Sequence, residues 1–88
     1  MHYMLCKNKV ADYAKWRQVF DSHAKAHRES GLHLLHLLRE MDDPNTIVFM
    51  FKVDDMDKVQ AFINAPEAAE GAKQGGVIGQ TEVTFLTD

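Results

Sequence analysis

The sequence predicts an α+β fold with the element order β-α-β-β-α-β, in a single domain that spans residues 1–88. Three observations support this fold class. An unbroken apolar run covers Thr46–Val53, a helical apolar period covers Ala11–Ser30, and a β-branched run covers Thr81–Thr87. Because a chain of 88 residues has enough helix to cover only one face of a sheet, a second copy of the chain is the expected cover for the other face.

The run Thr46–Val53 is expected to be a strand that is buried on both faces. Successive side chains of a strand point to opposite faces of its sheet. One face would carry Ile47, Phe49, Phe51 and Val53, and the other would carry Val48 and Met50. A half-buried strand would alternate apolar with polar residues, whereas here only Lys52 interrupts the apolar run after Thr46.

The first two elements are a short strand, His2–Lys7, and an amphipathic helix, Ala11–Ser30. Polar Asn8 and Lys9 are expected to form the turn between them. The residues that recur at helical spacings of three and four are Tyr13, Trp16, Phe20, His23, Ala24 and His27. Gly31 follows this stretch and can adopt the left-handed conformation that ends a helix.

Leu32–Arg39 is expected to be a second strand that forms a hairpin with Thr46–Val53. The turn falls at Asp42–Asn45, where proline presets a backbone angle and aspartate can bond the turn backbone. His33 and His36 differ by an odd number, so regular alternation would place them on opposite faces of the sheet. One would then face the helices, and the other would face the partner sheet or a rim.

A second helix and a last strand complete the pattern. Asp54 and Asp55 suit the N-cap of this helix, and Pro66 suits the first turn of a further short helical segment. The apolar stripe of the second helix consists of Met56, Val59, Phe62 and Ile63. Gly75, Gly76 and Gly79 mark a flexible loop before Thr81–Thr87. This order is that of the ferredoxin-like plait, in which the first and third strands lie in the middle of the sheet.

Composition excludes several partners. The chain has 10 Lys and Arg residues against 13 Asp and Glu, a net charge of -3 and no basic block, so neither nucleic acid nor an anionic membrane is an expected partner. No apolar run is long enough to span a membrane, and the first residues lack the pattern of a secretory signal, so we expect a cytoplasmic protein. Cys6 is the single cysteine and is expected to be a buried hydrophobe.

Three segments resemble a known superfamily. They are V-A-D-Y-A-K-W-R-Q-V-F-D-S-H (Val10–His23), D-D-P-N (Asp42–Asn45) and F-K-V-D-D-M-D-K-V-Q-A-F (Phe51–Phe62). These resemble small bacterial proteins of the dimeric α/β-barrel superfamily, whose members include antibiotic biosynthesis monooxygenases and many proteins of unassigned function.

The resemblance implies a homodimer in which two sheets pair face to face, with a small apolar pocket between the sheet and the helices of each subunit. The enzymes of this superfamily include cofactor-free quinol oxygenases, haem-degrading oxygenases, polyketide cyclases and lactone isomerases. The oxygenases use an Asn, a Trp and a His or Tyr that line this pocket. Here the predicted first strand contains no Asn before the turn residue Asn8, and Thr46–Val53 contains no Trp.

The aromatic face of the first helix is the candidate ligand site. Tyr13, Trp16, Phe20 and His23 lie on it, with apolar walls and polar tips. His23 is the candidate catalytic acid or base, because imidazole has the near-neutral pKa that proton transfer requires. His23 and His27 also have the spacing of a metal-ligand pair, but no third ligand follows from the sequence, and we expect neither a metal nor a cofactor.

Two functions remain open at this point. The first is a cofactor-free enzyme, monooxygenase-like or cyclase-like, that acts on a small aromatic or polyketide-like molecule. The second is a non-catalytic dimer that binds a small molecule or only assembles. Whether the polar groups of the first helix converge on a cavity distinguishes the two.

Overall fold

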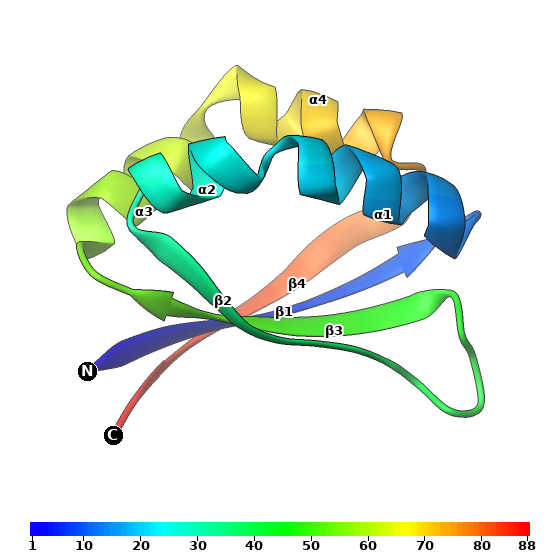
Figure 1. The fold of residues 1–88 in the computed structure, drawn as a ribbon, viewed down its shortest axis with the longest axis horizontal. Helices are drawn as coiled ribbons and strands as arrows, with labels where there is room; N and C mark the ends of the chain where they lie inside the picture. Colours follow the sequence, from blue (N-terminus) through cyan, green and yellow to red (C-terminus); the bar gives the residue numbers. More distant parts are fainter.

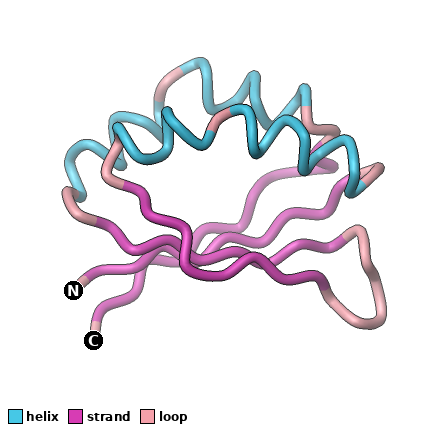
Figure 2. The backbone as a smooth tube through the Cα atoms, in the orientation of Figure 1, coloured by secondary structure: helices cyan, strands magenta, loops and turns pink.

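A computed structural model describes residues 1–88 as a four-stranded sheet with four helices on one of its faces (Figure 1). The strands are β1 (His2–Val10), β2 (Leu32–Arg39), β3 (Thr46–Val53) and β4 (Val77–Thr87). The helices are α1 (Tyr13–Ser22), α2 (Ala24–Glu29), α3 (Met56–Asn64) and α4 (Pro66–Gln74). No element of the chain covers the other face of the sheet (Figure 2).

The sheet has the strand order β2-β3-β1-β4, and all neighbouring strands are antiparallel. The order confirms the predicted ferredoxin-like α+β fold, with β1 and β3 in the centre. No helix has the length and apolarity needed to cross a membrane.

The core lies between the sheet and the helices. On β3 the predicted inner face, Ile47, Phe49, Phe51 and Val53, is buried. In the register of β1 and β3, Met4 lies opposite Phe51 and Cys6 lies opposite Phe49, so the two central strands form one apolar floor. Trp16 of α1 and Val59 of α3 close this core from the helical side.

Aspartate side chains cap two helices and stabilise the hairpin turn. Asp55 caps α3 by accepting a hydrogen bond from the backbone N–H of Asp57 at 2.9 Å. Asp12 caps α1 in the same way, so the helix begins at Tyr13 rather than at Ala11. In the predicted hairpin turn, Asp43 accepts a hydrogen bond from the Thr46 hydroxyl at 2.8 Å.

The single helix predicted over Ala11–Ser30 is wrong, because it is broken at His23 into α1 and α2. The Ser22 hydroxyl donates to the Val19 carbonyl at 2.6 Å, which occupies the acceptor that the His23 N–H would use in a continuous helix. The His23 N–H bonds to Phe20 instead, at 3.1 Å, in a tighter turn.

The turn predicted at Asn8 and Lys9 is also wrong, because β1 continues to Val10. Likewise β4 begins at Val77 rather than at Thr81. Between Lys7 and Lys9 of β1, the pairing on β4 moves from Glu82 to Ile78, so β4 carries an irregularity there. Gly79 lies in this irregular segment at φ 76°, a conformation that glycine adopts without steric cost.

His33 and His36 lie on the same face of the sheet, which corrects the prediction of opposite faces. His33 pairs with Lys52 and His36 pairs with Met50, and both partners point away from the helices. The register shifts between Leu34 and His36, so β2 carries one extra residue at a bulge. This extra residue reverses the alternation on which the prediction depended.

The face away from the helices carries apolar side chains in its centre. Val48 and Met50 of β3 lie there with Leu5 of β1, and all three are half-buried. Leu38 and Leu86, on the two edge strands, are exposed. We call this set of five residues the outer apolar face.

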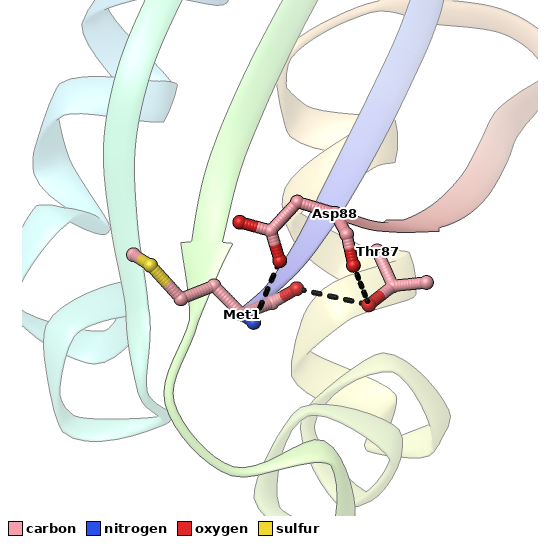
Figure 3. Close-up of polar contacts among 3 residues, drawn as sticks. All are labelled: Met1, Thr87 and Asp88. Atoms are coloured by element: carbon pink, nitrogen blue, oxygen red, sulfur yellow. Dashed lines mark hydrogen bonds and ion pairs between the residues drawn. The ribbon is translucent and has the colours of Figure 1, made fainter.

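The two chain ends lie side by side where β1 begins and the neighbouring edge strand β4 ends (Figure 3). The amino group of Met1 pairs with a carboxylate oxygen of Asp88 at 2.9 Å, and the Thr87 hydroxyl donates to the Met1 carbonyl at 3.1 Å. These contacts extend the ladder between β1 and β4 to its last residues.

Candidate functional site: a cavity between helices and sheet

A cavity of about 590 Å³ lies between the sheet and the helical layer. Fifteen of its 22 lining residues are hydrophobic, which is the composition of a site for a small organic molecule. The lining comes from all four strands below, with β2 contributing only Leu32, and from all four helices above. The cavity is therefore built from both ends of the chain.

Stacked aromatic rings form one wall. The rings of Trp16 and Phe20 stack with centroids 4.8 Å apart, and Phe49 meets them at 5.5 and 5.3 Å respectively. Only 4 % of Trp16 is exposed. These rings are large, flat and fixed by packing, so a planar apolar ligand can stack against them without ordering new side chains.

Asn8 supplies the buried polar group of the cavity. It is only 5 % exposed, and its Oδ1 is the one buried side-chain polar atom of the chain without a hydrogen-bond partner. A buried amide oxygen without a partner costs about 1–3 kcal/mol. Because Asn8 lines the cavity, a ligand hydroxyl or N–H group could supply the missing donor.

His27 supplies a neutral imidazole. Its ring lies among Phe20, Phe51 and Phe62, with centroids 5.1, 5.3 and 5.6 Å away. Burial, together with the neighbouring His23, lowers the pKa of His27 from 6.5 to about 4. At neutral pH the ring is therefore uncharged and has one nitrogen that can accept a proton or a hydrogen bond.

Of the four predicted ligand-site residues, Trp16 and Phe20 line the cavity, whereas Tyr13 and His23 do not. The Tyr13 hydroxyl accepts a hydrogen bond from Arg17 at 3.3 Å, and its ring lies 3.9 Å below the Arg39 guanidinium carbon. His23 packs against α4, where a Cβ atom on Gly71 would lie 2.9 Å from its Cε1 atom. The catalytic role of His23 stays a prediction.

Sequence reasoning missed Asn8 and His27 as cavity residues, although both left a signal. His27 lies seven residues after Phe20 and eleven after Trp16, so all three share one helical face. Asn8 continues the inward alternation of Met4 and Cys6. Ending the strand at Lys7 concealed that signal.

Helix α4 forms a roof of small residues. Ala68, Ala69, Gly71 and Ala72 line the cavity from this side. Gly75 ends the helix against Trp16, because a Cβ atom there would lie 3.0 Å from the indole Cδ1. The small side chains let α4 lie close to α1 while the cavity stays open beneath it.

Two other chemistries have little support at this site. No group of three or more His, Cys, Asp or Glu side chains is placed to hold a metal ion. Burial raises the pKa of the Cys6 thiol to about 12, so Cys6 carries no thiolate at neutral pH. The cavity offers instead an amide oxygen, an imidazole and aromatic walls.

The fold defines the chain as a ferredoxin-like α+β protein, and solved structures share it along almost the whole chain. A candidate antibiotic biosynthesis monooxygenase from Bordetella bronchiseptica matches with a TM-score of 0.81 and 13 % identity, over 99 % of this chain and 95 % of that one. An Asn-to-Ala variant of SnoaB, a cofactor-independent oxygenase from Streptomyces nogalater, matches with a TM-score of 0.75 and 21 % identity, over 99 % and 91 %.

An uncharacterised NIPSNAP domain protein from Burkholderia xenovorans has the same fold, with a TM-score of 0.71 and 12 % identity over 100 % of this chain and 94 % of that one. No protein-family model and no curated protein sequence matches the chain. The similar structures, which include the antibiotic biosynthesis monooxygenase type, establish the fold of this chain. Its chemistry must be argued from the cavity.

Proposed function

We propose that the chain is a small cofactor-free enzyme, monooxygenase-like or cyclase-like, that acts on an aromatic or polyketide-like molecule in the cavity. The supporting observation is the unpartnered Oδ1 of buried Asn8 in an apolar cavity that also contains the neutral imidazole of His27. The similarity to the fold of SnoaB is consistent with this chemistry.

The two polar groups would have different roles. Asn8 Oδ1 would accept a hydrogen bond from a phenolic hydroxyl and hold the ring in place. His27 would accept a proton from an acidic C–H or O–H group, because its lowered pKa keeps it neutral at pH 7. A base with a pKa of about 4 is weak, so the substrate must be acidic or must be activated by its own conjugation.

Oxygenation without a cofactor requires that the substrate supply the electrons. A benzylic CH₂ group flanked by electron-rich rings can react with O₂ to give C=O and H₂O, and this reaction balances without another reductant. The protein would hold the substrate and accept the first proton. A cyclase would use the same proton acceptor without O₂.

We further propose that two copies pair through the outer apolar face. Four strands about 4.8 Å apart, each about eight residues long, give a face on the order of 500 Å² per copy. Two such faces bury about 1,000 Å², which reaches the lower limit for a specific interface. Leaving this face in water would expose the five apolar side chains of the outer apolar face.

The alternative is a non-catalytic binding dimer, and one feature of His27 favours it. His27 makes no side-chain hydrogen bond within the chain, so no carboxylate or carbonyl orients its ring as is usual for a catalytic histidine. In this alternative the cavity would bind its ligand without turnover.

Ligand binding and O₂ consumption distinguish these proposals. Quinols and flat phenols are titrated against the protein with Trp16 emission as the readout, and O₂ uptake is recorded with each ligand that binds. Enzymatic uptake that is lost in both His27→Phe and Asn8→Leu supports the oxygenase. Binding without uptake or cyclised product supports the binding protein, and failure of every ligand to bind contradicts both.

A further inference from the structure

Lys73 is the only charged residue among the residues that line the cavity. His27 also lines it, but its imidazole is neutral at pH 7. We propose that Lys73 makes the cavity selective for organic anions, so that its ligand is a flat apolar molecule that carries a carboxylate or a comparable acidic group. This inference rests on the proposed role of the cavity as a ligand site.

The ammonium of Lys73 has no partner within the chain. Lys7 pairs with Glu40 at 3.0 Å, and Lys25 pairs with Glu29 at 3.8 Å. Glu70 lies one helical turn before Lys73 but forms no ion pair with it. The charge at the cavity is therefore not neutralised by the protein.

Lys73 lies at the edge of the cavity lining. It is in the last turn of α4, one turn after Ala69, which also lines the cavity, and its side chain is exposed. A ligand that carries an acidic group at this edge of the cavity would meet the long Lys73 side chain. The aliphatic stem of lysine can lie along apolar surface while the ammonium stays in water.

No other group at the site can serve as the counter-charge. His27 is neutral at pH 7 because its pKa is about 4, and Asn8 has no charge. The last carbonyl groups of α4 carry a partial negative charge, which repels an anion. Without Lys73 the site would therefore disfavour an acidic ligand, whereas the affinity for a neutral ligand would depend on the apolar walls.

Two fluorescent probes test this inference because they share one apolar skeleton. Anilinonaphthalene sulfonate is an anion, and phenylnaphthylamine is its uncharged counterpart. Each is titrated against wild type, Lys73→Gln, Lys73→Arg and Lys58→Gln, with energy transfer from Trp16 as the readout. Lys58 is the matched control, because it is an exposed, unpaired lysine on α3 outside the cavity lining.

We expect Lys73→Gln to weaken binding of the anionic probe by about three- to fivefold, the upper range for an exposed charge pair, and to leave binding of the neutral probe within twofold. Lys73→Arg should retain the affinity for the anion, and Lys58→Gln should change neither probe. Added salt should weaken binding of the anionic probe but not of the neutral probe, and this salt effect should be smaller in Lys73→Gln than in wild type.

Two results would overturn the inference, and they differ in what they say about the cavity. If both probes bind wild type but Lys73→Gln leaves the anion unaffected, or Lys58→Gln weakens it equally, Lys73 does not select the ligand although the cavity binds one. If neither probe receives energy from Trp16, the ligand-site proposal fails as well. Circular dichroism of each variant confirms that the fold is retained.

Discussion

The neutral histidine in the aromatic core makes a quantitative prediction about acid stability. His27 has a folded pKa of about 4 against an ordinary value of 6.5, because burial disfavours its charged form. Between these two values the unfolded chain binds a proton that the folded chain does not. The free energy of unfolding therefore falls as the pH decreases from about 6.5 to about 4, and below that range this contribution becomes constant.

The size of the effect follows from the shift. Each pKa unit corresponds to about 1.4 kcal/mol, so the full shift sets an upper limit of about 3 kcal/mol. Water that reaches the ring through the cavity reduces this figure, and we expect a loss of about 1–2 kcal/mol between pH 7 and pH 4.

The assay is urea denaturation at several pH values, with wild type, His27→Phe and His36→Gln compared in parallel. Phenylalanine matches the three aromatic neighbours of His27 and does not titrate, so His27→Phe should lose about 1–2 kcal/mol less than wild type over this range. His36 lies on the face of the sheet away from the helices, so His36→Gln is the control for removing a histidine outside the cavity. Equal pH dependence in wild type and His27→Phe would refute the neutral, buried imidazole.

Three further predictions concern other parts of the fold. Asn8→Leu should raise the free energy of unfolding by about 1 kcal/mol because it removes an unpartnered amide, while it weakens hydroxyl-bearing ligands; a destabilised variant that retains its affinity would contradict this. The change that Gly71→Ala makes to the free energy of unfolding should be about 1 kcal/mol more favourable in a His23→Ala background than in wild type, because the new Cβ atom meets the His23 ring. An additive double-mutant cycle would rule out that contact. Met50→Lys should convert the proposed dimer into a monomer in light scattering with unchanged circular dichroism, and a wild-type protein that is monomeric at micromolar concentration would exclude the dimer.

The element order was predictable because periodicity depends on burial, and burial differs clearly between the two faces of β3 and of α1. What the sequence could not indicate are single-residue irregularities. The extra residue in β2 places His36 on the same face as His33, and the Ser22 hydroxyl breaks a helix whose apolar period continues beyond it. Both depend on one local hydrogen bond or register step that leaves the apolar pattern unchanged.

The candidate site was predictable in part for the same reason. Trp16 and Phe20 are large and apolar, so their position on the inner face of α1 follows from periodicity. Asn8 is polar and follows an apolar strand, and a polar residue at that place more often begins a turn than lines a cavity. Its burial is costly without a ligand, and for this reason it is the stronger indication of function.

The space between helices and sheet is the proposed binding site of a small apolar molecule, and the emission of Trp16 tests this proposal most directly. Phenylnaphthylamine is titrated against wild type and Ala72→Phe, a variant in which a large ring on α4 fills the cavity. We expect saturable energy transfer from Trp16 with one probe per chain in wild type, and its loss in Ala72→Phe with the fold intact. Absence of transfer in wild type, or equal transfer in both proteins, would contradict the assignment of the cavity as the ligand site.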